Sequence, residues 1–314
     1  MLKVGLVGVG GISGAHIPAW KAMEDVELVA LCDVRAELME KYPEQHHYTD
    51  FEEMLKQEKL DILDICLPTY LHADYAIKAM NQGIHVISEK PISLKREDVA
   101  RVYAAAEANR VKFMVAQVLR FWPEYVFVKE LYDTGKYGKL LSGSMQRLGN
   151  IPKWSWDGWM QDETRSGMVP FDLHIHDSDF LVYTFGKPEN VVVHRSKRPE
   201  QDYISAVYEY PGFFITAEAS WYAGSHPFTT GYRFQFEHAV VVMEKGKIMV
   251  YGDDGSVQNL SEGSDVDTGT MTVPKSNAYA NEIRYFTDCV IKDLPVEKVK
   301  PEELEAVIDI LKML

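Results

Sequence analysis

The chain has 314 residues, of which 46% are hydrophobic and 25% are charged. These fractions are those of ordinary globular proteins and exclude a disordered, fibrous or coiled-coil chain, and the length favours two domains. Lys and Arg number 33 and Asp and Glu number 47, which gives a formal net charge of −14. That charge repels phosphate backbones and anionic lipids, so we expect neither nucleic acid nor a membrane as partner.

The N-terminal residues and the cysteines favour a reducing compartment. Met1–Val7 is apolar over too few positions to form a signal peptide or a membrane span. The 3 cysteines, Cys32, Cys66 and Cys289, are far apart and lie in apolar runs. We therefore expect buried thiols rather than disulfides or a metal cage, and a cytoplasmic protein.

Residues 1 to about 120 alternate short β-branched runs with amphipathic helical stretches, which predicts a parallel sheet covered by helices. The expected strands are Leu2–Val7, Val26–Cys32, Ile62–Leu67, Ile84–Ser88 and Lys112–Val118. The expected helices are Ile12–Met23, Phe51–Glu58, Leu71–Asn81 and Leu94–Asn109. We expect Gly83 to end the third helix in a left-handed conformation and Ser93 to cap the start of the fourth.

The pattern changes after residue 120. A helix is expected at Tyr125–Asp133, a strand at Lys139–Arg147, a Trp-rich segment to about Asp162, and a helix at Leu173–Thr184. From Asn190 to about Val273 turns separate β-type runs, at Val191–His194, Tyr203–Tyr210, Phe213–Trp221, Tyr232–Met243 and Lys247–Tyr251. These runs predict a large, mainly antiparallel open sheet. Helices at Ala278–Lys292 and Pro301–Met313 close the chain.

The expected architecture is therefore α/β. A doubly wound, dinucleotide-binding Rossmann domain covers residues 1–120, and an α+β domain covers residues 121–314.

A glycine-rich loop, Gly8-Val9-Gly10-Gly11-Ile12-Ser13, follows the first expected strand and opens the first expected helix. In a dinucleotide-binding loop the first glycine permits a tight turn and the second lets the backbone approach a pyrophosphate. Ser13 stands at the third glycine position and is small enough for close helix packing. Glycines also serve turn geometry alone, so the loop by itself leaves a turn without a ligand open.

Asp33 ends the second expected strand, at the separation expected of the acid that binds the adenosine ribose hydroxyls. A carboxylate at this position repels a 2′-phosphate, which favours NAD over NADP. Arg35 follows two residues later and could accept that phosphate. NADP therefore stays open as the less favoured cofactor.

Four segments resemble the glucose-fructose oxidoreductase and inositol dehydrogenase family. They are Asp64–His72, Gly83–Pro91 with its Glu89-Lys90-Pro91 motif, Gln117–Pro123 followed by Gly135–Leu140, and Gly167–Gly186, where Asp172 and His176 match the family's Asp-x-x-x-His. The resemblance covers nearly the whole chain. It implies a Rossmann domain, a sheet-and-helix domain, a sugar or polyol substrate between them, and homodimers or homotetramers assembled through the open sheet.

The resemblance also implies the residues that contact the cofactor. They are Gly8, Gly10, Gly11, Ile12, Asp33, Arg35, Leu67, Pro68, Thr69, His72, Glu89, Lys90 and Gln117. Within this set we expect His72 to wall the nicotinamide pocket and Glu89 to position Lys90 or the nicotinamide. We interpret His16 as structural.

Alcohol oxidation needs a base tuned near neutral pH and a positive charge near the developing alkoxide. The resemblance gives these roles to His176 as base and Lys90 beside the reacting oxygen, while Asp172 binds a substrate hydroxyl or holds the imidazolium. On a helix the i, i+4 spacing of Asp172 and His176 places both side chains on one face. From spacing alone, the simpler interpretation is that Asp172 and His176 form a surface pair and that Lys90 is solvated. The match of all three positions to the family's motifs favours a catalytic site.

Trp154, Trp156 and Trp159 lie just before this segment, and the family's matching loop faces the substrate. Aromatic rings stack on the C–H face of sugars, so these residues and Arg165 are candidate substrate contacts. The alternative is that the tryptophans anchor the loop or an oligomer contact.

His174 stands where the family commonly has glycine, and the surrounding run Asp172–Asp179 contains several possible metal ligands. A His-x-His pair suits a strand better than the helix expected here, so we expect no metal. We expect His174 to pack at the edge of the site or to contact substrate.

Three functions follow from these residues. An NAD-dependent sugar or polyol dehydrogenase is favoured, because a protein that only senses dinucleotide or sugar has no need of a base. The sensor, and a lyase or hydrolase that retains NAD and cycles it, remain as alternatives.

Overall fold

The computed structural model describes residues 1–260 and 278–314, which form two compact units. The first contains Met1–Val118 and Ala278–Leu304, and the second contains the remaining described residues. The chain passes between units next to residue 120, where the sequence predicted a domain boundary. The return of Ala278–Leu304 to the first unit differs from the expected division, because helix α8 (Ala278–Ile291) packs against α1 (Ser13–Lys21).

The first unit contains a six-stranded parallel sheet in the order β3-β2-β1-β4-β5-β6. Its strands are β1 (Leu2–Val7), β2 (Val26–Cys32), β3 (His46–Tyr48), β4 (Ile62–Ile65), β5 (His85–Glu89) and β6 (Phe113–Ala116). The order reverses between β1 and β4, which is the doubly wound arrangement that the sequence predicted. Such sheets bind ligands beyond the carboxyl ends of the strands at this reversal.

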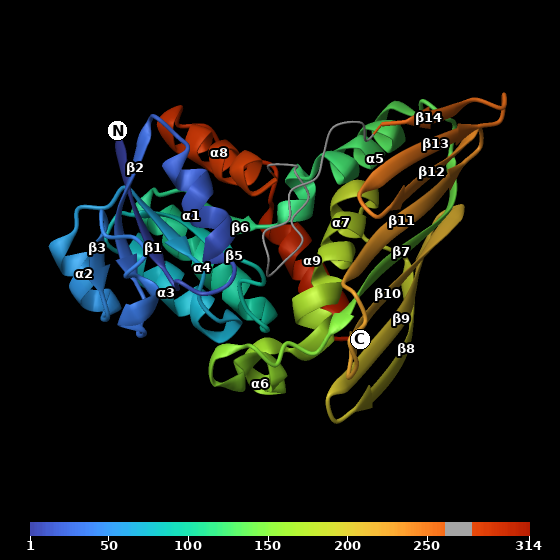
Figure 1. The fold of residues 1–314 in the computed structure, drawn as a ribbon. Coiled ribbons are helices and arrows are strands. Elements are labelled where there is room, and N and C mark those ends of the chain that lie inside the picture. Colours follow the sequence, from blue (N-terminus) through green and yellow to red (C-terminus); the bar gives the residue numbers. More distant parts are fainter. Residues whose placement is uncertain (261–277) are drawn as a thin grey trace. The chain divides into compact units, whose positions relative to one another are not determined.

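Helices cover both faces of this sheet, and Figure 1 shows α1 beside α8. The remaining helices are α2 (Phe51–Gln57), α3 (His72–Met80) and α4 (Arg96–Asn109), with short 3₁₀ turns at Ala36–Leu38 and Thr69–Leu71. All of β4 is buried, as expected of a parallel strand with helices on both sides.

Two expected helix ends have different outcomes. Gly83 has φ +80°, which confirms the left-handed end after α3. The predicted cap at Ser93 is wrong, because α4 begins at Arg96 after Lys95. The Ser93 hydroxyl instead donates to Asp98 Oδ2 at 2.5 Å and accepts from the Lys95 amide at 3.1 Å, so it orders the approach to the helix.

The second unit contains an eight-stranded sheet in the order β14-β13-β12-β11-β7-β10-β9-β8. Its strands are β7 (Leu140–Asn150), β8 (Asn190–Arg198), β9 (Gln201–Tyr210), β10 (Phe213–Tyr222), β11 (Thr229–Phe236), β12 (Ala239–Glu244), β13 (Lys247–Gly252) and β14 (Val257–Asn259). Only the β7–β10 pair is parallel among the described strands of this sheet, so the expected mainly antiparallel sheet is confirmed.

The single run expected at Tyr232–Met243 is wrong, because it forms β11 and β12, joined by a turn at Glu237 and His238. The continuous β-type composition of the run conceals this turn. The last part of the β region, expected to reach Val273, lies outside the described residues.

The helices of the second unit are α5 (Pro123–Thr134), α6 (Glu163–Ser166) and α7 (Ile175–Phe185), with 3₁₀ turns at Val118–Phe121 and Trp156–Gln161. Helix α9 (Pro301–Leu311) follows α8 in the chain. The expected helix at Leu173–Thr184 begins earlier, as a π-helix over Pro170–His174 that runs directly into α7.

One face of the eight-stranded sheet is buried along its central strands, and Figure 1 shows α5 and α7 beside this sheet. Tyr208, Ile215, Phe234 and Val241 lie in one row across the strands, and each of these side chains is 0% exposed. This row forms the core of the second unit. Within residues 1–260 and 278–314, each helix is too short or too polar to cross a lipid bilayer.

Candidate functional site

The glycine loop leaves β1 in a conformation that only glycine adopts without strain. Gly8 has φ +93°, and a Cβ built on it would lie 2.6 Å from the backbone carbonyl of Cys66. The Ser13 hydroxyl donates to the Gly10 carbonyl at 2.7 Å, which closes the loop as α1 begins. Gly8 is therefore required for the close approach of the loop to the end of β4.

The outer side of the loop is more open. A Cβ built on Gly10 reaches 4.0 Å from Arg35 Nη2 and nothing nearer among the described residues. Gly11 is exposed and Ile12 is partly exposed. A loop that is open at Gly10 and leads into a helix N-terminus fits a pyrophosphate, because the first-turn amides point toward the bound anion.

The Asp33 carboxylate joins the glycine loop to the end of β2. Its Oδ2 accepts from the Val9 amide at 2.8 Å, and its Oδ1 accepts from the Arg35 amide at 2.9 Å. The Arg35 side chain also contacts both oxygens, through Nε at 3.1 Å and Nη2 at 3.2 Å. The predicted ribose acid and the predicted phosphate acceptor thus form one ion pair beside the loop.

The segment after β4 contains four of the predicted cofactor contacts. Leu67 and Pro68 are partly exposed, whereas Thr69 is buried. His72 is buried, with Nε2 2.6 Å from the Leu67 carbonyl oxygen and Nδ1 2.7 Å from the Pro91 carbonyl oxygen. His72 therefore ties this segment to the residue that follows Lys90.

Glu89 and Lys90 stand at the end of β5. Glu89 is buried, and its Oε2 accepts a hydrogen bond from the Lys90 backbone amide at 3.0 Å. The Lys90 side chain is partly exposed, and the Lys90–Pro91 peptide bond is cis. Gln117, just after β6, is buried. The structure thus gives Glu89 a contact with Lys90, one of the two roles that the sequence analysis proposed.

His16, which we interpret as structural from the sequence, has two buried partners that the sequence analysis did not name. Its ring lies between Asp64, 2.9 Å from Nδ1, and Glu89, 3.0 Å from Nε2. The available signal was Asp64 itself, an acid inside an otherwise apolar strand, which needs a buried partner.

In the second unit, the π-helix and the start of α7 place Asp172 and His176 in a largely buried segment. Over residues 170–182, only Asp172, Leu173 and His176 are not buried. The segment follows Gly167, at φ +72°, and a Cβ there would lie 2.5 Å from the Phe171 side chain. Asp172 and His176 are therefore presented by a rigid, well-packed element.

Two buried ion pairs hold α7. Arg147 Nη2 lies 2.8 Å from Asp177 Oδ1, and Arg120 Nη2 lies 2.6 Å from Asp179 Oδ1. Burial would lower the pKa of Arg147, but the adjacent Asp177 charge outweighs it and raises that pKa. The Arg147 guanidinium therefore stays charged, and the two ion pairs anchor Asp177 and Asp179 near His176 on the helix.

His174, which we expect to pack at the edge of the site or to contact substrate, lies inside the second unit. It is buried, and its Nε2 lies 2.8 Å from the Tyr208 hydroxyl, which also contacts Ser178 Oγ at 2.7 Å. Burial lowers the pKa of His174 to about 4, so its ring is neutral at pH 7. The residue connects the π-helix to β9.

The tryptophan segment has an exposed side. Trp154 is 70% exposed and Trp156 is 41% exposed, while Trp159 is partly buried. Arg165 donates from Nη1 to Asp157 Oδ2 at 2.9 Å and from Nε to Asp162 Oδ2 at 3.0 Å, so it also shapes its own loop. Exposed tryptophans indicate a binding surface. The contact of these residues with a substrate stays a prediction.

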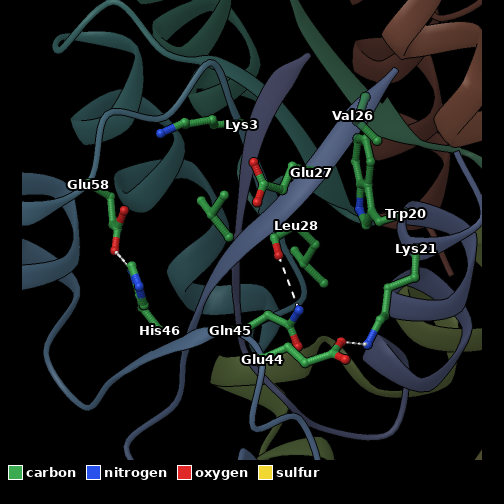
Figure 2. A pocket seen from close by; sticks show the side chains of 11 residues that line it. Lys3, Trp20, Lys21, Val26, Glu27, Leu28, Glu44, Gln45, His46 and Glu58 are labelled. Atoms are coloured by element: carbon green, nitrogen blue, oxygen red, sulfur yellow. Dashed lines mark hydrogen bonds and ion pairs between the residues drawn. The ribbon is translucent and has the colours of Figure 1, made fainter. Parts of the chain in front are cut away.

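A hollow of about 400 Å³ lies in the first unit, at the amino-terminal ends of β1 and β2. Figure 2 shows two ion pairs in its lining, Lys21 with Glu44 at 3.0 Å and His46 with Glu58 at 2.6 Å. The hollow lies at the amino-terminal ends of the strands, whereas the glycine loop lies at their carboxyl ends. Because parallel sheets bind ligands at the carboxyl ends of their strands, we assign the cofactor to the loop and not to this hollow.

Two family models match the chain. The oxidoreductase family with an NAD-binding Rossmann fold matches residues 2–117, and the GFO/IDH/MocA C-terminal domain matches residues 125–258.

Individual relatives agree with these matches. An uncharacterized oxidoreductase of Schizosaccharomyces pombe is 24% identical over 94% of this chain and 83% of its own length. The inositol 2-dehydrogenase of Salmonella paratyphi B is 28% identical over 57% of this chain, and the match spans 53% of that enzyme. The solved structure of levoglucosan dehydrogenase in complex with NADH and levoglucosan has a TM-score of 0.83 at 18% identity and covers 99% of this chain and 95% of that one. This structural likeness shows the shared fold.

Proposed function

Because the chain belongs to the Gfo/Idh/MocA family of NAD-binding oxidoreductases, we propose that it is an NAD-dependent dehydrogenase of sugars, inositols or related polyols. The reaction moves hydride between nicotinamide and a hydroxyl or carbonyl carbon. Relatives whose names give inositol and levoglucosan as substrates support this substrate class.

The observation that best supports catalysis is the presentation of Asp172 and His176. The neighbouring side chains of His174, Asp177, Ser178 and Asp179 are fully buried, whereas these two remain partly accessible. A protein that only binds ligands has no need to hold an imidazole accessible on so rigid an element. This contrast favours the enzyme over the sensor.

We assign each group one step in alcohol oxidation. His176 removes the hydroxyl proton, which passes to its imidazole, and Asp172 orients the substrate or the imidazolium. The Lys90 ammonium hydrogen-bonds to the reacting oxygen and stabilises its negative charge. Trp154, Trp156 and Trp159 contact the C–H face of the substrate, with Arg165 as a polar contact.

The residues of the first unit fit NAD. Gly8, Gly10, Gly11 and Ile12 would hold the pyrophosphate, Asp33 with Arg35 would hold the adenosine ribose, and the nicotinamide would lie against Leu67, Pro68, Thr69, His72 and Gln117. When bound, NAD supplies the hydride acceptor.

Absorbance of NADH tests the function directly. We expect purified protein with NAD to produce NADH with at least one member of a panel of sugars, inositols and sugar acids, and NADP to support a lower rate. Binding of NAD without reduction by any member would favour the sensor. Product formed while NAD stays bound and is not consumed would favour the lyase or hydrolase.

Substitution of Asp33 tests the cofactor preference. We expect Asp33→Ser to lower kcat/KM for NAD and raise it for NADP, changing their ratio by about 10–100-fold, because a 2′-phosphate gains Arg35 and loses a repelling carboxylate. The measurement is kcat/KM with each cofactor. Glu37→Ser, at an exposed acid just beyond Arg35, is the matched control. An unchanged ratio in Asp33→Ser would contradict the assignment of Asp33 to the ribose.

We also propose that the chain forms homodimers or homotetramers through the open face of the eight-stranded sheet. Val192, Val207, Phe214, Val242 and Tyr251 are exposed or partly exposed on this face, which we call the sheet face. Apolar side chains exposed on a sheet favour burial against a second copy.

Light scattering after size-exclusion chromatography tests this assembly. We expect the wild-type chain to elute as a dimer or tetramer and Val242→Asp to dissociate it, because an interface excludes an unpaired carboxylate. Ile291→Asp, at an exposed apolar residue of α8, is the control that should leave the mass unchanged. A monomeric wild-type protein would rule out the sheet face as a stable interface.

A further inference from the structure

A buried chain of three side chains connects helix α1 to the end of β5. His16 lies in the first turn of α1, directly after the glycine loop, and is 0% exposed. Its two ring nitrogens face two carboxylates, Asp64 at 2.9 Å and Glu89 at 3.0 Å. Asp64 is the third residue of β4, and Glu89 is the last residue of β5. The ring therefore joins three elements that meet beneath the loop.

Three groups other than His16 donate hydrogen bonds to these two carboxylates. Asp64 Oδ2 also accepts from Trp20 Nε1 at 2.7 Å, and Asp64 Oδ1 accepts from the Cys66 thiol at 3.6 Å. Glu89 Oε2 accepts from the Lys90 amide at 3.0 Å. With both carboxylates ionised, His16 donates to each of them only if both its ring nitrogens carry protons. The geometry therefore fits an imidazolium between two carboxylates.

The electrostatic balance agrees with this protonation. Burial would lower the pKa of His16, but the polar groups around the ring, Asp64 foremost, outweigh burial and raise that pKa well above its ordinary value. Burial would raise the pKa of Glu89, but the hydrogen bond and charge of His16 outweigh it and lower that pKa.

The same atoms invite comparison with a metal site. One nitrogen of His16, one oxygen of Asp64 and Cys66 Sγ lie within 4.8 Å of one another. Burial raises the pKa of the Cys66 thiol to about 12, so the sulfur stays protonated and donates to Asp64. Because the thiol keeps its proton and both carboxylates accept hydrogen bonds, the cluster fits a charged His16 ring better than a metal ion.

We propose that His16 is a positioning residue, whose charged ring holds Glu89 ionised and thereby fixes the Lys90 backbone at the end of β5. This inference rests on the dehydrogenase function proposed above. Lys90 is flanked by two residues that buried histidines contact, Glu89 by His16 and Pro91 by His72. Because His16 belongs to the helix that begins at the glycine loop, one side chain links the cofactor loop to the lysine.

Replacing His16 by glutamine tests this role in turnover. We expect kcat to fall about 10–100-fold while KM for substrate and the Kd for NAD stay within about threefold, because a displaced lysine weakens catalysis more than binding. His47→Gln, the same change at an exposed histidine of β3, should leave all three values unchanged. A folded His16→Gln protein with the wild-type kcat would overturn the proposal, even if its Tm were lower.

Nuclear magnetic resonance tests the proposal without any substrate. In protein labelled with ¹⁵N-histidine and ¹⁵N-lysine, we expect both His16 ring nitrogens to keep imidazolium shifts from about pH 6 to 9. The Lys90 amide proton, which donates to a carboxylate, should shift upfield in His16→Gln and stay in place in His47→Gln. Neutral-ring shifts for His16, or an unmoved Lys90 amide, would overturn the proposal.

Glu89→Gln is the second variant, in case His16→Gln does not fold. Loss of one carboxylate should lower the pKa of His16 so that its ring loses a proton within the same pH range, and an unchanged titration would overturn the proposal. Stoichiometric metal in purified wild-type protein, absent from Cys66→Ser, would overturn it as well. If the wild-type enzyme oxidises no substrate, the dehydrogenase function fails, whereas the His16 and Lys90 resonances still decide the positioning role.

Discussion

Lys90→Met should lower kcat by about 10²–10⁴-fold while the Kd for NAD stays within about threefold. Methionine retains much of the length of the side chain and removes the ammonium that we place on the reacting oxygen. The affinity for NAD should change little, because Lys90 is only one of the many residues that we assign to the cofactor. The measurements are steady-state NADH formation and a fluorescence titration of NAD binding.

Lys95→Met is the matched control, because Lys95 is exposed and lies only five residues further along the same segment. It should retain the wild-type kcat. His176→Ala should lose turnover as Lys90→Met does and keep the affinity for NAD, because it removes the proposed base. Near-wild-type rates in either Lys90→Met or His176→Ala would contradict the assignment of that residue to the reaction.

Arg147→Met should lower the free energy of unfolding by about 3–5 kcal/mol, because it leaves the Asp177 carboxylate buried without its cation. Both partners of this pair are buried, and the Arg147 guanidinium also donates to the Tyr125 hydroxyl at 3.2 Å. Because Asp177 is adjacent to His176, kcat should fall together with stability. Urea unfolding followed by circular dichroism gives the free energy.

Lys139→Met is the control for this substitution, since Lys139 is an exposed lysine directly before β7, the strand that contains Arg147. It should change the free energy of unfolding by less than about 0.5 kcal/mol. Adding Asp177→Asn to Arg147→Met should recover part of the loss, because the buried charge is then removed. If Arg147→Met were as stable as Lys139→Met, the pair would not anchor α7.

Local sequence patterns predicted the first unit well. The β-branched runs located β1 and β2 at their observed bounds, and the loop between β1 and α1 followed from glycine spacing. Strand β3 was missed because its three residues, His46–Tyr48, are polar or aromatic and show no alternation. Edge strands of this length depend on pairing with β2, which a sequence pattern does not contain.

The second unit and the buried networks were harder to predict. The i, i+4 spacing of Asp172 and His176 indicated a shared helix face, but nothing in the residues signalled the π-helix that precedes α7. His16 appeared structural because its partners, Asp64 and Glu89, are 48 and 73 residues away in the chain. Contacts at such separations are set by the order of strands in the sheet. The partners of a buried polar residue such as His16 therefore cannot be identified from local sequence patterns.

The parallel pairing of β7 with β10 also bears on how the chain folds. Parallel neighbours cannot be joined by a tight hairpin, so the polypeptide between them must complete a long crossover first. That crossover contains the tryptophan segment, Asp172, His176 and all of α7. Pairings across such sequence distances form slowly, because loop-closure entropy is lost before the contacts are gained. The segment with the proposed base is thus enclosed in a long connection that the sheet closes at its centre, so its length adds to the entropy cost of pairing β7 with β10.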